Sequence, residues 1–351
     1  MLPAALCAIG AAALFGVSIP LAKWLGLADS PLVGTALLYG GAGLGLLLAL
    51  GVSRLGGRRS REAALRARDA PILIAIVALG GLCGPILQLY GLARTAGSTA
   101  SLLLNLEVVF TMGVAVVAFR DHIGRRETVA AALVLGGAAW LSWQTAGGGA
   151  SRTSAIGAAA IAASCLAWAV DNNLTQKLSG RDPRAITAVK GLGAGACAAL
   201  LAWQTGAVVP PLKIVAVGLA LGAVSYGSSL VLYVRALRGL GAARTGALFA
   251  TAPFVGAVVS FALLGERPGW VHLGAGTLMA AGVLLLTAGA AHQHEHEHEM
   301  MEHEHLHTHD EHHQHEHRGD EGPEPHAHPH RHEGMRHEHP HVPDLHHRHR
   351  H

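Results

Sequence analysis

Three ionisable residues stand inside long apolar segments of this 351-residue sequence. Glu107 lies in LLLNLEVVFT, Asp171 in CLAWAVDNNLTQK and Lys190 in AITAVKGLGAG. A charge at the centre of a membrane-spanning helix costs about 2.5–3.5 kcal/mol on insertion scales, so such residues are usually kept for a function. Here the carboxylates could carry a proton through a transport cycle or hold a cationic solute, and the sequence leaves both chemistries open.

Amide and hydroxyl side chains accompany these charges. One helical stripe, at spacings i, i+4, i+7 and i+11, combines polar groups with an indole: Ser164, Trp168, Asp171 and Thr175. Such a stripe suits a polar cavity better than lipid. We therefore predict a substrate pathway lined by Asn105, Glu107, Asp171, Asn172 and Lys190. The alternative is a structural ion pair in which Lys190 partners Asp171 or Glu107.

A second set of reactive side chains fills the C-terminal tail, residues 292–351. It holds 23 of the 25 histidines and 14 of the 23 acidic residues. Neutral imidazoles bind Ni²⁺, Zn²⁺ and Co²⁺, and alternating His and Glu offer many ligand sets. The tail is thus predicted to be disordered and to bind divalent metal. No cofactor is expected to be required. The alternative to metal binding is a pH-sensitive tether. The candidate ligands are His294, His296, His298, His303, His305, His307, His309, His312 and His313.

The residues before the tail are too apolar for a soluble protein. Only nine of the 23 acidic residues lie in residues 1–291. Apolar segments follow one another there, and about 20 such residues are enough to cross a bilayer as a helix. We predict ten transmembrane helices and an all-α integral membrane protein. The expected spans are 4–23, 32–52, 71–91, 97–118, 128–145, 154–174, 186–205, 214–234, 245–263 and 271–291.

The basic residues orient these spans. With the N-terminus in the cytoplasm, the inside loops hold 15 lysines and arginines and the outside loops hold five. This positive-inside bias predicts that both termini are cytoplasmic in a multi-pass protein of the cell inner (plasma) membrane. The N-terminus has no basic residue before Lys23, so we expect a retained first span rather than a signal peptide.

Small residues and prolines mark where the helices pack and bend. Glycine pairs at four-residue spacing let helix backbones approach closely in lipid: Gly41 and Gly45, Gly191 and Gly195, Gly218 and Gly222. Prolines within or beside spans predict a kink or a break at Pro20, Pro85 and Pro253.

An internal repeat relates the two halves of the membrane region. When the chain is shifted by 145 residues, apolar spans coincide, and the charged break RDHIGRRE matches GERPGW. Five spans per half is an odd number, so the halves must enter the membrane from opposite sides. The sequence therefore predicts two inverted five-helix repeats, residues 1–146 and 151–291, followed by the tail at 292–351. Such repeats build alternating-access transporters.

The stretch GALFATAPFVGAVVSFALLGERPGW, followed by a span ending in AGVLLL, resembles the second repeat of EamA-type transporters of the drug/metabolite transporter superfamily. The matching features are Pro253 and the pair Gly265-Glu266. The first half departs from the pattern, with Glu107-Val108 in place of Ala252-Pro253 and Arg120-Asp121 in place of Gly265-Glu266. The resemblance implies ten spans and transport of small organic solutes, often outward, but leaves the substrate open.

The predicted function is a secondary transporter, in the exporting direction, of a small metabolite or a divalent metal cation, with a cytoplasmic metal-binding tail. The alternative is a membrane-anchored metal buffer or sensor. The ten predicted spans disfavour it, because one transmembrane helix is enough to anchor a protein in the membrane. No enzymatic motif lies in a span, so an enzyme is not expected. The expected partners are the lipid bilayer and the small-molecule or metal-ion substrate; a homodimer is compatible with the sequence, and no nucleic acid is expected.

Overall fold

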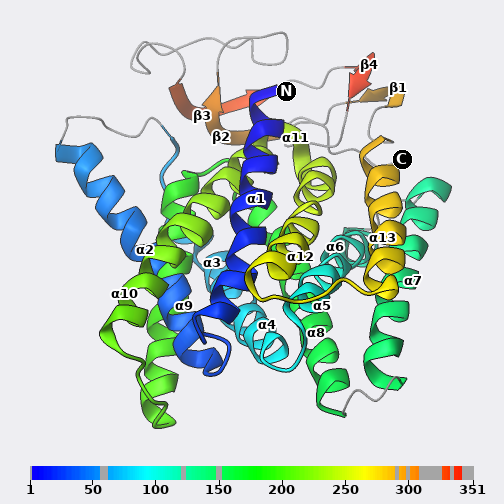
Figure 1. Ribbon diagram of the computed structural model, residues 1–351. Helices are drawn as coiled ribbons and strands as arrows, with labels where there is room; N and C mark the ends of the chain where they lie inside the picture. Colours follow the sequence, from blue (N-terminus) through cyan, green and yellow to red (C-terminus); the bar gives the residue numbers. More distant parts are fainter. Residues whose placement is uncertain are drawn as a thin grey trace.

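The computed structural model describes residues 2–55, 62–119, 124–147, 152–288, 292–297, 301–307, 326–332 and 336–341. Helices run up and down in a bundle, with short strands at one end (Figure 1). The first half contains α1 Leu2–Trp24, α2 Pro31–Leu55, η1 Ala67–Asp69, α3 Ala70–Ile76, η2 Val77–Cys83, α4 Gly84–Leu92, α5 Gly97–Leu103, α6 Leu106–Phe119 and α7 Arg125–Gly147. The second half contains α8 Arg152–Lys177, α9 Pro183–Gln204, α10 Leu212–Leu221, η3 Gly222–Gly227, α11 Ser228–Phe249, α12 Ala252–Leu263 and α13 Trp270–Ala288.

Each predicted span falls on helical structure, which makes this a multi-pass membrane protein. Within the described residues, eight helical segments are long and apolar enough to cross a bilayer. The other two predicted spans lie in α7 and α13, and the apolar stretch of α13, Trp270–Leu286, is shorter. The count of ten spans stays a prediction.

Two of the spans are interrupted by π-helical turns. These turns are η2 and η3, and they begin 145 residues apart, at Val77 and Gly222. The disturbance predicted at Pro85 corresponds to η2, which ends just before this proline. Proline has no N–H to donate to the carbonyl of Gly81, so the regular helical hydrogen bond is missing there. No proline lies in η3, which is bounded instead by Gly222 and Gly227.

Two further spans are broken at matching places. Leu104 and Asn105 separate α5 from α6, and Ala250 and Thr251 separate α11 from α12, where Pro253 sits in the first turn of the new helix. Pro20, in contrast, lies inside α1, which continues to Trp24. The break at Leu104–Asn105 has no proline in its sequence and was not predicted.

The connection predicted between the spans 214–234 and 245–263 differs from the structure. Residues 235–244 continue α11 instead of forming a polar loop. Their arginines predicted a loop, but Leu237 and Leu240 are buried on the same helix, so this segment packs on the protein.

Helices at equivalent positions of the two halves pack against each other: α2 lies on α9, and α7 lies on α13. Glycines allow this approach. A Cβ at Gly191 would lie 2.6 Å from the backbone nitrogen of Gly43, and one at Gly195 would lie 2.6 Å from the Cα of Gly40. The predicted close packing at the Gly191–Gly195 pair is confirmed.

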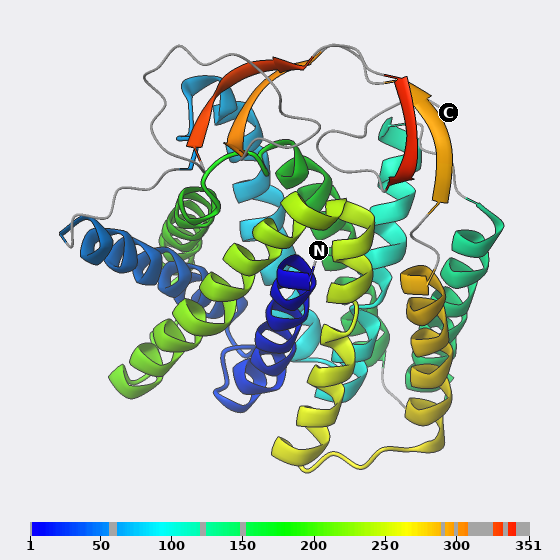
Figure 2. The same cartoon turned by 90° about the horizontal axis from the view of Figure 1, so that it is seen from above.

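Four strands follow the bundle: β1 His292–Glu297, β2 Met301–His307, β3 His326–His332 and β4 Arg336–His341. They form two antiparallel pairs, β1 with β4 and β2 with β3, which are seen from above in Figure 2. The disorder predicted for residues 292–351 stays a prediction. In these segments strand pairing satisfies backbone groups without a core, and alternation of His and Glu has the period of a strand.

Candidate substrate cavity

Two adjoining cavities lie between the two halves of the bundle. Glu107 and Asn172 line both, and Asp171 and Lys190 line the second. The cavity volumes are about 20 and 40 Å³, which is room for a few water molecules, so a larger solute requires the helices to move apart. Four of the five predicted pathway residues are therefore brought together, from α6, α8 and α9.

Asp171 and Lys190 form an ion pair inside the protein. The Lys190 Nζ lies 2.5 Å from Asp171 Oδ2, and the two side chains are only 5% and 4% exposed. Thr175 Oγ1 lies 3.5 Å from the other carboxylate oxygen of Asp171. The alternative partner for Lys190, Glu107, is not the one that the structure selects.

Glu107 is held differently, by an amide from the other half of the chain. Its Oε1 accepts a hydrogen bond of 2.7 Å from Asn172 Nδ2. The carboxylate lies in the first turn of α6, directly after the break at Leu104–Asn105. A helix N-terminus favours an acidic side chain, so the break that starts α6 helps to keep Glu107 inside the bundle.

The wall behind Asp171 is the π-helical turn η2. The carbonyl of Gly80 accepts hydrogen bonds from the hydroxyl of Tyr39, at 2.8 Å, and from Nε1 of Trp168, at 3.0 Å. A Cβ added at Gly80 would collide with the carboxylate of Asp171. The turn therefore both anchors two aromatic side chains and leaves space for the acid.

The helical stripe predicted on α8 is only partly at the cavity. Trp168 and Asp171 line it, whereas Ser164 donates to the carbonyl of Ile161. Asn105 is also buried, but it does not line either cavity: its Nδ2 lies 3.1 Å from the carbonyl of Leu102 and 3.8 Å from the sulfur of Met279. Residues two apart on a helix do not face the same side, which agrees with Asn105 lying away from the cavities that Glu107 lines.

Sequence reasoning missed the aromatic lining. Three of the four tyrosines, Tyr39, Tyr226 and Tyr233, line the second cavity together with Phe15 and Phe249. Ring centroids lie 5.5 Å apart for Tyr39 and Tyr226 and 4.9 Å apart for Tyr233 and Phe249. The scarcity of tyrosine in spans otherwise built from Ala, Gly, Leu and Val was the signal that could have identified them.

The model of the EamA-like transporter family matches this chain twice, at residues 2–143 and 155–288. The chain belongs to this family. It is a transporter of the drug/metabolite transporter superfamily rather than an enzyme, and its partners are the lipid bilayer and a small-molecule substrate.

Two relatives of this EamA-like transporter share 29% identity with it. One is an uncharacterized transporter from Methanothermobacter thermautotrophicus, similar over 64% of this chain and 66% of its own length. The other is named a probable terminal-alkyne amino-acid exporter, from Streptantibioticus cattleyicolor, and is similar over 71% of this chain and 84% of its own. A crystal structure with a TM-score of 0.63 and 19% identity covers 81% of this chain and 96% of its own, which shows the same fold.

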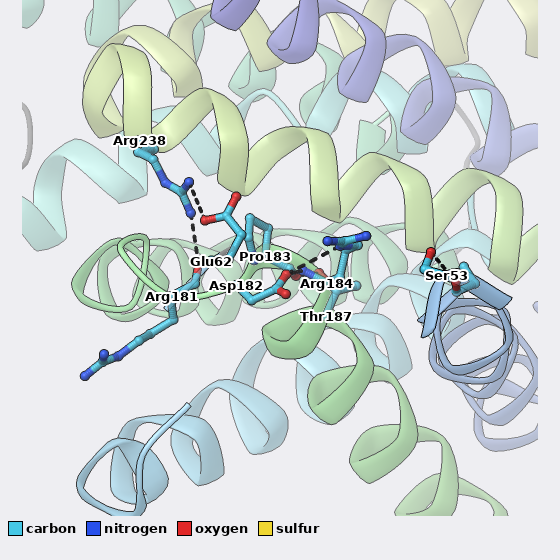
Figure 3. Close-up of polar contacts among 9 residues, drawn as sticks. Ser53, Glu62, Arg181, Asp182, Pro183, Arg184, Thr187 and Arg238 are labelled. Carbon is cyan, nitrogen blue, oxygen red and sulfur yellow. Dashed lines mark hydrogen bonds and ion pairs between the residues drawn. The ribbon is translucent and has the colours of Figure 1, made fainter. Parts of the chain in front are cut away.

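At the end of the bundle where α1 begins, charged contacts join the two halves of the transporter. Arg238 lies 2.8 Å from Glu62 and donates to the carbonyl of Arg181 at 3.0 Å (Figure 3). It also donates to the carbonyl of Ser179 at 3.0 Å. Arg181 in turn lies 3.0 Å from Asp69. We call this set the arginine cluster; it ties the α2–α3 connection to α11 and the α8–α9 connection.

At the opposite end, one carboxylate joins the halves. Glu266, from the α12–α13 connection, accepts hydrogen bonds from the backbone nitrogens of Gly97 and Ser98, at 2.6 and 2.8 Å, and from the Ser98 hydroxyl, at 2.6 Å. Nearby, Thr99 Oγ1 lies 3.1 Å from His272 Nε2. Glu266 belongs to the Gly-Glu pair that carries the family resemblance, and here it caps the start of α5.

The histidines predicted to bind metal fall into two sets. His294 and His296 lie in β1, and His303, His305 and His307 lie in β2. Four others lie outside the described residues: His298, His309, His312 and His313. In the part of the chain whose side chains the structure describes, which excludes the tail, no three His, Cys, Asp or Glu side chains gather in a metal-binding group.

Proposed function

We propose that this EamA-like transporter exports a small organic solute that carries an ammonium group, through the cavity lined by Glu107, Asp171, Asn172 and Lys190. The observation that carries this proposal is the excess of negative charge there: of the described residues lining the two cavities, two are acidic and one is basic. A cationic group on the solute would balance the second carboxylate. Asn105 lies at the α5–α6 break and not on the cavity wall.

The aromatic rings favour an organic solute over a divalent metal as cargo. A bare cation would find only one carboxylate without a basic partner, Glu107, among many ring carbons. An ammonium group on a carbon skeleton, in contrast, gains from aromatic faces as well as from the acid. The relative named as an amino-acid exporter supports an amine-bearing substrate.

The function is tested by flux through the purified, full-length protein in liposomes. Protein-containing vesicles loaded with an amino acid of apolar side chain should release it faster than protein-free liposomes loaded in the same way. They should also exchange it for labelled amino acid outside. Vesicles loaded with Ni²⁺, Zn²⁺ or Co²⁺ serve as the comparison. Metal flux without amino-acid flux would refute the organic cargo and favour the predicted metal cargo instead.

We further propose two inverted five-helix repeats, 1–146 and 151–291, with both termini in the cytoplasm and the protein in the inner (plasma) membrane. Several observations support this arrangement. The π-helical turns start 145 residues apart, equivalent helices pack on each other, and the beginning of α1 and the end of α13 lie at the same end of the bundle (Figure 1). The arginine cluster lies at that end too, as the positive-inside bias requires.

Topology mapping should place the two ends of the chain on one side. Reporter fusions after residue 60 and at the C-terminus are both expected to read cytoplasmic, because an even number of spans returns the chain to its starting side. A fusion in the connection between α9 and α10, after Gly206, is the matched control and should read outside. A C-terminus that reads outside would contradict both the ten spans and the inverted repeat.

The tail is proposed to bind divalent metal and to tune transport. The strand register supports this: His294 stands opposite His339 and His296 opposite His337, while in the other pair His303 stands opposite His330 and His305 opposite His328. Histidine positions thus recur directly opposite each other in both strand pairs, and imidazole is a common ligand of these metals. A membrane-anchored metal buffer remains the alternative if flux is absent.

Truncation after Ala291 should remove metal binding without removing transport. Equilibrium dialysis of the full chain in detergent is expected to show several bound Ni²⁺, Zn²⁺ or Co²⁺ ions, and the truncated chain should bind almost none. Binding should weaken below about pH 6, where protons compete for imidazole, which ordinarily titrates near pH 6.5. Equal metal binding by both chains would contradict the assignment, and loss of flux from an inserted truncated chain would show that the tail is not accessory.

A further inference from the structure

We propose that Lys190 is the residue by which the transporter selects solutes carrying a carboxylate. When the cavity is empty, the carboxylate of Asp171 binds the Lys190 ammonium at the place that a solute carboxylate would take. A zwitterionic solute displaces Asp171 from the ammonium. This inference rests on the proposed function and deepens it by dividing the roles of the charged residues.

The geometry of the pair is that of a binding site already filled. Lys190 Nζ lies 2.5 Å from Asp171 Oδ2, both side chains are more than nine-tenths buried, and both residues line the cavity that Glu107 also reaches. A lysine ammonium has three N–H donors. Asp171 is the one hydrogen-bond partner that the described residues give it, so further donors are available to an incoming oxygen.

The charges of the cavity favour a zwitterion in this exchange. A solute carboxylate on Lys190 would free the Asp171 carboxylate, and the solute's own ammonium group would then partner the freed acid and Glu107. Lys190 is then paired with the solute carboxylate, the solute ammonium is shared by the two acids, and the net charge of the cavity does not change. A carboxylic acid without an amine would instead add a third negative charge, and a simple amine would leave the Asp171–Lys190 pair intact and use Glu107 alone.

The exchange is also feasible mechanically. Asp171 lies on α8 and Lys190 on α9, which belong to the same half of the chain. The pair can therefore open without separating the two halves. Removing one partner from a buried ion pair is costly because the other charge stays uncompensated, but replacing a protein carboxylate with a solute carboxylate keeps the lysine paired.

The test compares three matched solutes: an α-amino acid with an apolar side chain, the amine that lacks its carboxylate, and the acid that lacks its amino group. Uptake in exchange for internal solute is measured with purified full-length protein in liposomes. The variants are Asp171→Asn, Lys190→Met and the double variant Lys190→Met/Asp171→Asn. If Lys190→Met does not fold, the double variant provides a site in which the loss of Lys190 does not leave Asp171 as an unpaired charge. Lys213→Met, an exposed lysine at the start of α10, is the control.

Asp171→Asn should raise uptake of the acid relative to the amine about tenfold, because Lys190 no longer has a tethered competitor. The double variant should still transport the amine, through Glu107, but should lose about 10- to 100-fold in preference for the amino acid over the amine, which is the effect of one charge-assisted hydrogen bond. An unchanged amino-acid-to-amine ratio in the double variant would overturn the assignment and leave the pair structural. Absence of flux for all three solutes through the wild-type protein would refute the proposed function itself, and this inference with it.

Discussion

Glu107→Gln is expected to lower export of an ammonium-bearing solute about 10- to 100-fold at matched protein levels. The substitution keeps the shape and the hydrogen-bonding partner of the side chain, since an amide oxygen can still accept from Asn172 Nδ2. What it removes is the negative charge that has no basic partner in the cavity. A charge-assisted hydrogen bond contributes about 1.5–3 kcal/mol, which sets the expected loss.

The measurement is initial efflux from liposomes, with the thermal unfolding midpoint of each purified variant recorded in parallel. Glu127→Gln on α7, outside both cavities, is the matched control and should change neither quantity. Wild-type flux through Glu107→Gln would show that this carboxylate does not hold the solute.

Gly80→Ala should abolish most transport while leaving the helices assembled. The added methyl group would collide with the carboxylate of Asp171, and the end of a side chain yields more easily than the backbone behind it. Asp171 is therefore pushed off Lys190, which leaves two buried charges without their partners. We expect a flux reduction of at least about tenfold, together with a loss of stability of about 1–3 kcal/mol, typical of overpacking.

Gly113→Ala in α6 is the matched control, because a Cβ there meets nothing within 4 Å. It should transport and melt like the wild-type protein. A double variant, Gly80→Ala with Asp171→Asn, should regain part of the lost stability, since a neutral amide that leaves Lys190 costs less than a carboxylate. Normal flux through Gly80→Ala would show that the position of Asp171 does not matter for the cycle.

Much of the bundle could be predicted from the sequence because lipid imposes a simple rule. Apolar segments of sufficient length become helices, and the few charges inside them are costly, which is why Glu107, Asp171 and Lys190 stood out and why the structure brings them to one cavity. Which acid would pair with Lys190 could not be predicted. That choice depends on how α6, α8 and α9 pack, and no spacing within one helix contains this information.

Other features were hidden for identifiable reasons. The break at Leu104–Asn105 has no proline, so no residue type in the sequence indicated it. Asn105 was assigned to the pathway because it lies two residues before Glu107, but residues two apart on a helix do not face the same side. The aromatic lining was missed although tyrosine is scarce in these spans, because the sequence alone does not distinguish a ring that faces lipid from one that faces a cavity. In the tail, the abundance of histidine is visible in the sequence. The pairing of His294 with His339 is not, because it depends on the register between two strands far apart in sequence.

The arginine cluster and the carboxylate of Glu266 have a joint consequence for the speed of transport. Both bridge the halves, at opposite ends of the bundle, and the cavity between them is small. Release to either side then requires direct charged contacts to be exchanged for contacts with water, whatever solute lies inside. The free-energy barrier for breaking these contacts is set by the protein and not by the solute. Solutes that differ widely in half-saturating concentration should therefore share nearly the same maximal rate.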